Sequence, residues 1–574
     1  MRGMKVTGAQ IIVKILENQG VKIVAGIPGG AVLPLYDELY NSPIRHILVR
    51  NEQGAGFLAQ GMARTTGHSA VCIATSGPGA LNLMTAIADA RADSIPLVVI
   101  TGQVKTSQIG TDAFQEADTF GLSFPITKHS MMVTSAKELL TALPKAFEIA
   151  ERGRKGPVLI DVPRDIQTEE IEIDAWPKVV EPCHKAIRFR TTGDTLSQML
   201  LQAAQLLYSA KKPVLYLGGG CNSKKAASLI ADFLSVKPMP VVTTLMALGC
   251  VAHDNPLNLG MLGMHGFVSA NRAMYDADIV LAAGAHFDDR ATGLVDKFCP
   301  NAQIIHIDID AAEVNKIYSA IVPIVSDVES VFPVLIRLLT EKNKAESSNT
   351  KNLTSSICDQ WIKDLQKLKQ QEIKPETAGQ FIISVANQAI KAGFTADKTI
   401  ITTDVGQHQM WVAQFYPIMR PMQFLTSGSL GTMGFGLPVA IGAALQNPGK
   451  RVLCFTGDGS IMMNVQELAT LAEENLDVTV IVLDNGVLGM VRQQQEFACN
   501  KRYSASVYKK TPDLCAIAQG FGIPSMQVDS DTWGDFAFPK EGSGPRFIQY
   551  KIAQSENVYP FVPAGKANID AIVK

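Results

Sequence analysis

The sequence predicts an α/β protein of three doubly wound domains, each built around a parallel sheet. Three observations support this fold class. Short, continuous apolar runs recur along the 574 residues and alternate with segments of helical periodicity. Several of these runs end in glycine-rich or acidic turns, as strands do where they bring loops to the carboxyl edge of a parallel sheet. Finally, 47% of the residues are apolar, which is enough for more than one core.

The first predicted domain spans residues 1–185. Its expected strands are the apolar runs at 23–28, 44–49, 70–75, 95–101 and 157–163. The turns that follow four of them are at 28–30, 51–54, 76–79 and 102–103. Because ligands gather at the carboxyl ends of strands in a doubly wound sheet, these turns are candidate binding loops. Glu52 has two interpretations: a residue of a helix's first turn, where the helix dipole favours it, or a functional carboxyl group.

The second predicted domain spans residues 190–345. Its expected strands are the runs at 213–220, 240–246, 279–285 and 304–310. Gly218-Gly219-Gly220 either approaches a phosphate or is a plain tight turn, and Asp308 and Asp310 either bind ribose hydroxyls or begin a helix. No GxGxxG follows a strand, so a standard Rossmann dinucleotide site is not indicated. A polar stretch without a period then predicts a linker at 346–374.

The third predicted domain spans residues 375–574. Its expected strands are the runs at 399–407, 451–456, 478–483, 525–529 and 545–552. Gly457-Asp458-Gly459-Ser460 is a turn whose glycines let backbone amides approach a ligand closely. Asn464 and Glu467 fit the N-cap and N3 positions of the helix that follows. The next strand brings Asp484-Asn485 to the same edge of the sheet.

An Asp and an Asn at two strand ends suit a divalent cation and a diphosphate. We expect Asp458 and Asn485 to be oxygen ligands of one Mg²⁺, completed by phosphate oxygens, a backbone carbonyl and water. Amides of the glycine turn and the helix N-terminus would bind the diphosphate. The alternative is a surface Asp-Gly turn and an unrelated Asn in a loop. The strand–helix–strand context favours the metal site.

Composition excludes several classes of function. The net charge of −2 leaves no footprint for nucleic acid or an acidic membrane surface. No apolar run approaches 18 residues, so no membrane span is expected. Nine cysteines without a CxxC pair are typical of thiols in a reducing compartment. Without a signal-like segment at the start of the chain, we expect a cytoplasmic protein.

The motifs match a known family. GDG, 24 further residues and then Asp-Asn resembles the thiamine diphosphate motif. Over nearly its whole length the chain resembles the thiamine diphosphate-dependent acetohydroxyacid synthases, the large catalytic subunits of acetolactate synthase. The stretches that carry this resemblance are GIPGGAVLPLYD (26–37), EQGAGFLAQGMAR (52–64), SGPGALN (76–82), IGTDAFQE (109–116), TLMALG (244–249), LGMLGMHG (259–266), FDDR (287–290), TTDVGQHQMW (402–411), LGTMGFGLP (430–438) and GDGS (457–460). LGMHG with FDDR is more specific than GDG and points to the branch that retains FAD.

The resemblance implies a transferase whose domains bind, in chain order, the cofactor's pyrimidine ring, FAD, and the diphosphate with Mg²⁺. Pyruvate would lose CO₂, and its two-carbon unit would join a second pyruvate or 2-ketobutyrate. This is the first common step of branched-chain amino acid biosynthesis. FAD would be structural. Active sites would form between the subunits of a homodimer or homotetramer, and a small regulatory subunit is implied as a partner.

The resemblance also implies roles for individual residues. Glu52 matches the acid that activates the cofactor through its pyrimidine ring, Gln103 matches a residue near the reacting carbon, and Met433 matches one that holds the cofactor bent. The carbonyl of Val487 would be a metal ligand beside Asp458 and Asn485. The other matches for the thiamine cofactor are Gly29, Gly30, Gly406, Gln407, His408, Gly431, Gly457, Gly459 and Ser460. The matches for FAD are Arg154, Gly218, Gly219, Gly220, Thr244, Leu245, Leu262, Met264, Gly284, Asp288, Arg290, Asp308 and Asp327.

Several positions depart from the family pattern. His286 stands where Arg is usual, and imidazole cannot replace a bidentate guanidinium. Asn51, Lys105 and Ser429 replace a usual His, Pro and Gly. Gln494 stands where many members have Trp, so we expect weak discrimination between pyruvate and 2-ketobutyrate. Three alternatives stay open: an FAD-dependent pyruvate oxidase, an FAD-free degradative acetolactate synthase and, because of these departures, a non-catalytic homologue.

Overall fold

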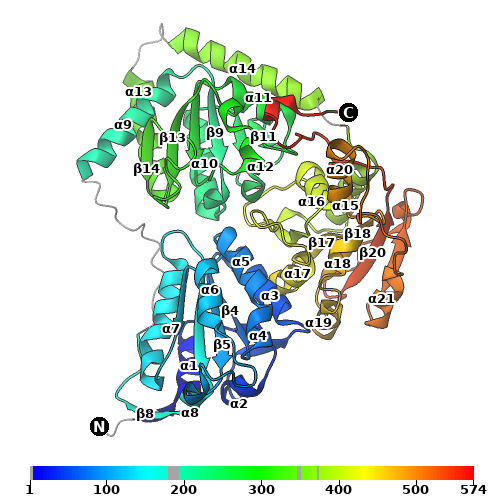
Figure 1. Cartoon of the computed structure of the whole chain (residues 1–574). Coiled ribbons are helices and arrows are strands. Elements are labelled where there is room, and N and C mark those ends of the chain that lie inside the picture. Colours follow the sequence, from blue (N-terminus) through cyan, green and yellow to red (C-terminus); the bar gives the residue numbers. More distant parts are fainter. Residues whose placement is uncertain (1–3, 179–192, 346–350, 372–373) are drawn as a thin grey trace.

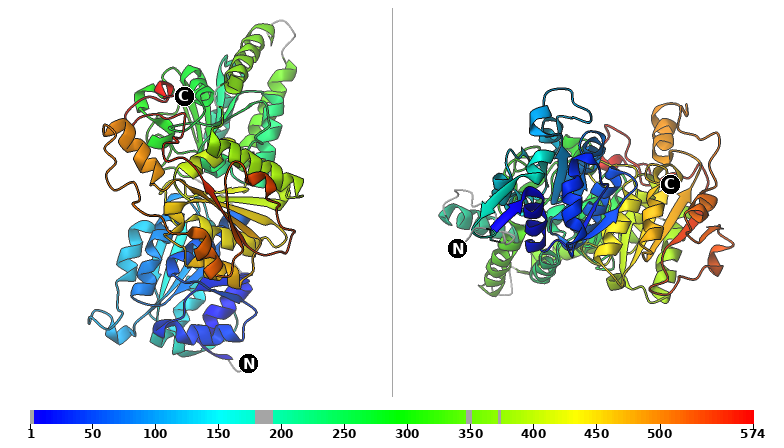
Figure 2. Two further views of the ribbon diagram at one scale, coloured as in Figure 1. Left: turned by 90° about the vertical axis from the view of Figure 1, so that its right-hand side faces the viewer. Right: turned by 90° about the horizontal axis from the view of Figure 1, so that it is seen from below.

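Three six-stranded sheets with helices packed against them make up the chain in the computed structural model (Figure 1). The structure describes residues 4–178, 193–345, 351–371 and 374–574. The N-terminal domain (blue) and the central domain (green) lie at opposite ends of the molecule, and the C-terminal domain (yellow to red) lies beside both. Figure 2 shows this arrangement from two further sides. All strand pairs within these sheets are parallel, which confirms the predicted fold class.

The N-terminal sheet has the strand order β3-β2-β4-β5-β7-β6. Its strands are β2 (Ile23–Gly26), β3 (Arg45–Leu48), β4 (Ala70–Ala74), β5 (Leu97–Gln103), β6 (His129–Met132) and β7 (Pro157–Pro163). Its helices are α1 (Gly8–Asn18), α2 (Leu33–Tyr40), α3 (Glu52–Thr66), α4 (Pro78–Asn82), α5 (Met84–Ala92), α6 (Thr119–Ser123), α7 (Ala136–Glu151) and α8 (Arg164–Thr168). One face of the sheet packs on α1 and α7, and the other packs on α3 and α5. An antiparallel pair, β1 (Met4–Thr7) and β8 (Glu170–Ile173), joins the two ends of the domain.

The central sheet has a different order, β11-β10-β9-β12-β13-β14. Its strands are β9 (Pro213–Leu217), β10 (Val241–Thr243), β11 (Asn258–Met261), β12 (Ile279–Ala283), β13 (Gln303–Asp308) and β14 (Val322–Val325). Its helices are α9 (Gly193–Ser209), α10 (Lys224–Val236), α11 (Val268–Asp276), α12 (Asp289–Thr292), α13 (Val328–Ala345) and α14 (Lys351–Gln371). β9–β11 follow one another toward one edge of the sheet and β12–β14 toward the other, so the strand order reverses between β9 and β12. Doubly wound sheets bind dinucleotides at such a switch point.

The C-terminal sheet repeats the order of the first, β16-β15-β17-β18-β20-β19. Its strands are β15 (Thr399–Thr403), β16 (Phe424–Leu425), β17 (Arg451–Gly457), β18 (Val478–Asp484), β19 (Ser525–Val528) and β20 (Arg546–Lys551). Its helices are α15 (Thr377–Lys391), α16 (Gln407–Phe415), α17 (Gly436–Gln446), α18 (Asp458–Ile461), α19 (Glu467–Glu473), α20 (Gly489–Ala498) and α21 (Leu514–Gly520). β15, β17 and β18 deliver the turns at 404–407, 457–460 and 484–487 to one edge.

Helices α3 and α17 pack directly on each other and join the N-terminal and C-terminal domains. A Cβ atom at Gly61 would lie 2.2 Å from the Val439 carbonyl oxygen, and one at Gly442 would lie 1.9 Å from that of Leu58. Any side chain at either position would overlap the facing backbone. The two glycines therefore let the helices touch, and one apolar core runs continuously through both domains.

Every strand expected from the sequence is present, and the structure adds short ones at the edges of the sheets. β6, β11, β14 and β16 have four residues or fewer. Each of them is the outermost strand on one side of its sheet, and it becomes a strand because the neighbouring strand offers hydrogen bonds. Within the described parts of the chain, no helix has the length and apolar character needed to cross a bilayer.

The linker expected at 346–374 is largely helical. α14 lies across the central domain in Figure 1 and buries Trp361 and Leu365 against its core. Among the residues of α14 whose burial is described, Cys358 is the first buried one. At the other end, residues 560–570 of the C-terminal domain lie against the central one, where Val562 N donates to the Met264 carbonyl at 2.9 Å.

One local prediction in the third domain was wrong. Asn464 is not the N-cap of the helix that carries Glu467, because α19 begins at Glu467 itself with Gln466 before it. A separate short helix, α18, begins directly at Asp458. The Asn464 side chain instead donates to the Gly434 carbonyl at 2.8 Å, a partner 30 residues away that the local sequence does not indicate.

Candidate active site

One cavity of about 960 Å³ lies where the three domains meet. This volume is in the range of sites for cofactors and other small molecules. The predicted residues that line it are Arg154, Gly218, Gly219, Gly220, Thr244, Leu245, Leu262, Met264, Gly284, Asp288, Arg290, Asp308, Asp327, Gly406, Gln407, His408, Gly431, Met433, Gly457, Asp458, Gly459, Ser460, Asn485 and Val487. The fold thus brings the expected flavin, diphosphate and metal residues to one space. Glu52, Gly29, Gly30 and Gln103 are not part of its lining.

The turn at residues 457–460, where β17 passes into α18, lines this cavity. Asp458 is buried, and its Oδ2 has no hydrogen-bond partner among the described residues. Burial, and then the charge of Asp484, raise the pKa of Asp458 to about 7. A carboxylate held in this way is poorly solvated, and a divalent cation would supply the missing countercharge. The orphaned oxygen therefore fits a metal ligand.

Asn485 lies beside Asp458 at the end of β18. Its Oδ1 accepts from Val487 N at 3.2 Å, and its Nδ2 donates to Gln407 Oε1 at 3.2 Å. No group of three or more His, Cys, Asp or Glu side chains that could hold a metal occurs in the described ranges. A site made of one carboxylate, one amide and one carbonyl suits Mg²⁺, which keeps water and phosphate oxygens as its other ligands.

Asp484, the acid before Asn485, already has a cationic partner in the protein. Its carboxylate forms an ion pair with Lys551 and accepts from Gln549 Nε2 at 2.5 Å. Its other oxygen accepts from Gly486 N at 3.2 Å. Asp484 is therefore held by β20 and by its own turn, and Asp458 is the carboxylate left for a cation.

His408, in the first turn of α16, packs between two glycines of the cavity wall. A Cβ atom at Gly406 would lie 2.9 Å from its ring, and one at Gly457 would lie 3.0 Å from its Nδ1. Burial lowers the pKa of His408 to about 3, so the imidazole is neutral. Its Nε2 has no hydrogen-bond partner within the described chain. The turns after β15 and β17 thus close around an uncharged ring with one free nitrogen.

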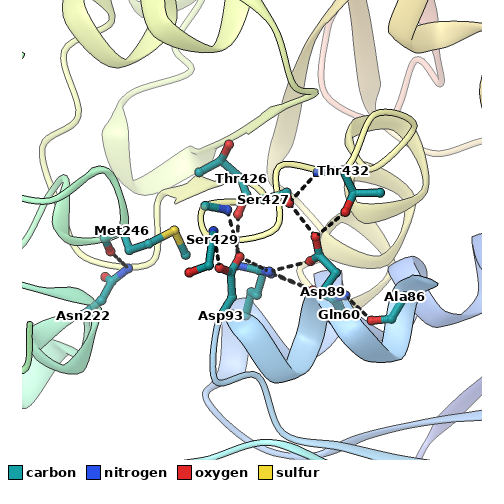
Figure 3. A network of polar contacts seen from close by, with 12 residues as sticks. Gln60, Ala86, Asp89, Asp93, Asn222, Met246, Thr426, Ser427, Ser429 and Thr432 are labelled. Atoms are coloured by element: carbon teal, nitrogen blue, oxygen red, sulfur yellow. Dashed lines mark hydrogen bonds and ion pairs between the residues drawn. The ribbon is translucent and has the colours of Figure 1, made fainter. Parts of the chain in front are cut away.

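The loop that carries Gly431 and Met433 is held by acids of the N-terminal domain (Figure 3). Asp89 of α5 accepts from Ser427 Oγ at 2.5 Å and from Thr432 Oγ1 at 2.8 Å. Asp93, at the end of the same helix, accepts from the backbone amides of residues 428 and 429 at 3.0 and 2.8 Å. We call Asp89, Asp93 and Arg64 the loop clamp.

Arg64 of α3 completes the loop clamp. Its guanidinium lies 2.8 Å from Asp93 Oδ2 and 3.3 Å from Asp89 Oδ1, and it donates to the Thr426 carbonyl at 3.1 Å. It also lies over the Phe435 ring. Sequence reasoning did not predict this contact, because the loop clamp and the loop that it holds are more than 330 residues apart in the chain and only tertiary packing unites them.

Replacing Arg64 with leucine should destabilise the protein strongly. Two buried carboxylates would lose their shared cation, and an uncompensated buried charge costs roughly 3–5 kcal/mol. Burial and Asp93 already raise the pKa of Asp89, and Arg64 opposes that rise. In the variant the folded state will bind protons that the unfolded state has released, so its stability falls as the pH rises.

Urea denaturation at pH 5 and pH 8 measures this effect. We expect the loss in the free energy of unfolding to be larger at pH 8. Arg45→Ala is the matched control, because Arg45 pairs with Glu474 across the same two domains but is more than half exposed. That control should change stability by about 1 kcal/mol or less. A loss for Arg64→Leu no larger than for the control would contradict this account of the loop clamp.

Glu52 begins α3 and faces the carboxyl edge of the N-terminal sheet. It is 8% exposed, and its Oε2 accepts from Asn82 Nδ2 at 2.9 Å. Asn51 before it is the N-cap and accepts from Gln53 N. Glu52 is thus both a first-turn residue and a buried carboxyl group. A Cβ at Gly79 would lie 3.1 Å from its Oε1, so the glycine turn after β4 packs closely against the acid.

Gln103 lies at the end of β5, and its amide is fully engaged by the protein. Nε2 donates to Asp161 Oδ2 at 3.0 Å and to the Ala117 carbonyl at 2.8 Å, and Oε1 accepts from Val104 N. Burial raises the pKa of Asp161 to about 7. The structure therefore places Gln103 next to a buried acid that the sequence did not single out.

On the central domain's side, the cavity opens at the switch point between β9 and β12. A Cβ at Gly218 would lie 2.1 Å from the Gly284 carbonyl oxygen, so the two glycine turns touch through their backbones. The buried Thr244 Oγ1 has no partner within the described residues. Arg154, from the N-terminal domain, lies 2.7 Å from Glu313 and 3.3 Å from Asp310.

Three family models match the chain, one in each domain. They are the N-terminal TPP binding domain (residues 6–122), the central domain (200–335) and the C-terminal TPP binding domain (404–539) of the thiamine pyrophosphate enzymes. Thiamine pyrophosphate, or TPP, is another name for thiamine diphosphate. The matches fall on the three sheets described above.

The chain is also similar, over nearly its whole length, to proteins named acetolactate synthase large subunits. The chain is 48% identical over 570 residues to the acetolactate synthase isozyme 1 large subunit of Escherichia coli (strain K12), covering 99% of this chain and 97% of the relative. It is 42% identical over 570 residues to the isozyme 2 large subunit of the same strain, with 99% of both covered. It is 43% identical over 581 residues to the acetolactate synthase large subunit of Corynebacterium glutamicum, covering 99% of this chain and 90% of the relative.

The three sheets, the shared cavity and the domain matches define the class: this protein is a thiamine pyrophosphate enzyme. The similarity over 99% of the chain defines the family more narrowly. The chain belongs to the acetolactate synthase large subunits.

Proposed function

We propose that this protein is the catalytic subunit of an acetolactate synthase that uses thiamine diphosphate and Mg²⁺. The observation that carries this proposal is Asp458, whose free oxygen lies beside Asn485 in a cavity large enough for the cofactor. Two pyruvate anions and one proton would give one 2-acetolactate anion and CO₂. With 2-ketobutyrate as acceptor, the product is 2-aceto-2-hydroxybutyrate. The membership of this chain in the acetolactate synthase family supports this reaction over a non-catalytic role.

Bound thiamine diphosphate would supply the stabilised carbanion that this decarboxylation and carbon–carbon bond formation require. Asp458, Asn485 and the Val487 carbonyl would hold Mg²⁺, and amides of the 457–460 turn would hold the diphosphate. Glu52 would share a proton through Oε1, because Asn82 occupies Oε2. Neutral His408 adds no charge to the wall of the site.

A direct assay tests the proposed reaction. Purified protein is incubated with pyruvate, Mg²⁺, thiamine diphosphate and FAD, and both 2-acetolactate and CO₂ are measured. We expect both products in equal amounts. Acetate or acetyl phosphate formed together with flavin reduction would instead select a pyruvate oxidase, and no turnover of pyruvate would select a non-catalytic homologue.

We further propose that FAD binds at the switch point of the central sheet. The strand order there, with β9 and β12 at its centre, is the order of dinucleotide-binding sheets, although the GxGxxG fingerprint is missing. Gly219 and Gly220 line the cavity and are exposed, so their backbone is open to a phosphate, and the free Thr244 hydroxyl offers a hydrogen bond. A flavin spectrum in the purified protein supports this assignment. A protein active without any flavin would favour the FAD-free degradative enzyme.

We propose that each active site combines two chains in a homodimer or homotetramer. Glu52, Gly29, Gly30 and Gln103 do not line the cavity of their own chain, so that cavity lacks an activating acid. Large apolar side chains near the edge of the N-terminal sheet, Leu33, Phe114 and Phe124, are exposed in the single chain. A partner chain would cover them and supply Glu52. A small regulatory subunit is proposed from the family name, and a cytoplasmic location stays a prediction.

Replacing Gln494 with tryptophan should shift the choice of acceptor. Gln494 lies on α20 and lines the cavity, where an apolar wall would favour the extra methyl group of 2-ketobutyrate. One methylene in an apolar pocket is worth about 1–3 kcal/mol. We expect the ratio of 2-aceto-2-hydroxybutyrate to 2-acetolactate, measured in a competition assay, to rise by about tenfold or more.

Gln494→Leu is the control, because it adds a smaller apolar surface at the same position and should give an intermediate ratio. An unchanged ratio in both variants, or a strong preference for 2-ketobutyrate in the unmodified protein, would show that Gln494 does not set the choice.

A further inference from the structure

Glu467 of the C-terminal domain binds the backbone that precedes Glu52. Glu467 is the first residue of α19 and is fully buried. Its Oε1 accepts from the backbone amide of Arg50 at 2.9 Å and from that of Asn51 at 3.1 Å. Its Oε2 accepts from Thr470 Oγ1 at 2.7 Å. An acidic side chain of one domain therefore ends in contact with two backbone amides of another.

These two amides belong to the segment that sets the direction of α3. A helix begins with amides that have no partner within the helix, and buried amides without partners are costly. Hydrogen bonds from amides to a carboxylate are stronger than those between neutral groups. The packing is also tight, because a Cβ at Gly54 would lie 2.6 Å from Glu467 Oε1. Glu467 thus contacts the start of α3 twice: it accepts from the amides of Arg50 and Asn51 before the helix, and it packs against Gly54 in the first turn.

Asn464 adds a second connection between the same segments. Its Nδ2 donates to Gln53 Oε1 at 3.2 Å and to the Gly434 carbonyl at 2.8 Å. Gln53 follows Glu52, and Gly434 follows Met433. The turn between α18 and α19 is therefore bonded to residues on both sides of Glu52 and to the loop that carries Met433.

Ion pairs also join these two domains, but they differ from the hydrogen bonds of Glu467 in being more exposed. Arg50 pairs with Glu473, and Arg45 pairs with Glu474, and each pair has a partner that is more than half exposed. Exposed pairs of this type contribute little and fix no backbone position. Only Glu467, among the described acids of α19, reaches backbone amides next to Glu52.

We propose that Glu467 is a positioning residue for Glu52, so that the C-terminal domain of the same chain sets the place of the activating acid. This inference rests on the proposed function, because it takes Glu52 as that acid. Helix α19 follows the turn at 457–460, which lines the cavity of its own chain. In this proposal α19 orients Glu52, an acid that does not line that cavity. Loss of the oxygen at position 467 that accepts from the two amides should slow proton removal from the cofactor without removing the metal ligands.

The first test is the rate at which the C2 proton of bound thiamine diphosphate exchanges with deuterium, followed by quench and NMR. We expect Glu467→Ala to slow this exchange at least tenfold, at saturating cofactor and Mg²⁺. Glu467→Gln keeps an oxygen that accepts from both amides and should stay within about threefold of the unmodified protein. Glu473→Ala removes a carboxylate from the same helix and should leave the rate unchanged.

A second readout needs no cofactor. Hydrogen–deuterium exchange of the backbone, measured by mass spectrometry on peptides that cover residues 49–55, should increase in Glu467→Ala and not in Glu473→Ala. Should Glu467→Ala fail to fold, Gly54→Ala replaces it: an added methyl group would displace Glu467 Oε1, while alanine is favourable inside a helix. We expect this variant to slow C2 exchange as well.

A double variant separates positioning from general damage. If Glu467 acts through Glu52, adding Glu467→Ala to Glu52→Gln will slow C2 exchange no further. A multiplicative loss in the double variant, or a rate for Glu467→Ala equal to that of Glu473→Ala, would overturn the inference while leaving the proposed function intact. A normal exchange rate in Glu52→Gln alone would instead remove the role of Glu52, and the inference with it.

Discussion

Glutamine at position 52 will lower turnover of pyruvate by about 10²- to 10⁴-fold, the range over which a positioned acid or base contributes to a rate. The amide cannot share a proton with the pyrimidine ring, but it has the shape of the acid and keeps an oxygen for Asn82 Nδ2, which now donates to Glu52 Oε2 at 2.9 Å. Binding of Mg²⁺ and thiamine diphosphate should therefore be retained. Steady-state kinetics for turnover, and calorimetry for binding, measure the two quantities separately.

The matched control is Gln53→Glu, which places a carboxylate one residue later in the same helix turn. In the Glu52→Gln background this change should not restore activity, because residue 53 faces Asn464 of the C-terminal domain. Near-normal turnover in Glu52→Gln would remove Glu52 from the mechanism.

Alanine at position 458 will abolish tight binding of the Mg²⁺–thiamine diphosphate pair. Asp458 is the carboxylate with a free, buried oxygen in the cavity, whereas the adjacent Asp484 is held by Lys551. Without it, the expected metal site has only neutral oxygen donors from the protein. We expect the apparent affinity for Mg²⁺ to fall by about 100-fold or more, by analogy with the loss of groups that tune a metal site.

Titration of Mg²⁺ against cofactor binding, followed by fluorescence or calorimetry, measures this affinity. Asp529→Asn is the control, because Asp529 follows β19 at the same edge of the sheet and is exposed. Its affinity should match that of the unmodified protein. An Asp458→Ala protein that binds Mg²⁺ and cofactor normally would show that the metal lies elsewhere.

The two variants together test how the active site is assembled. If each site takes Glu52 from one chain and Asp458 from the other, a mixed dimer of Glu52→Gln and Asp458→Ala chains has one intact site and one doubly altered site. Mixing and reassembling two inactive proteins should then recover activity. If both residues served the same chain's cavity, every site in the mixture would stay altered.

The fold was largely predictable from local pattern. Strands buried on both faces of a parallel sheet are continuous apolar runs, so each of the fourteen predicted runs appears as a strand. The short edge strands and the order β11-β10-β9-β12-β13-β14 were not predictable in this way. Edge strands such as β16 form because a neighbour offers hydrogen bonds, and strand order depends on how whole units pack.

The helix at 351–371 shows where local pattern misled the prediction. Its first part is polar, and polar stretches between domains usually form linkers. Trp361 and Leu365 find an apolar face on the central domain, and that tertiary contact makes the segment helical. The same holds for Asn464, whose side chain bonds Gly434 rather than capping a helix.

The sequence by itself determined the class of fold and the candidate residues for the metal and the cofactors, because these depend on residue type and on position after a strand. Asp458 and Asn485 are close in space for that reason alone. Only the tertiary structure decided which distant residues meet: the loop clamp of Arg64, Asp89 and Asp93 with the loop at 426–432, and Glu467 with the amides before Glu52. It also separated Glu52 from the cavity of its own chain. Long-range partners of this kind depend on how domains dock, and no local period encodes docking.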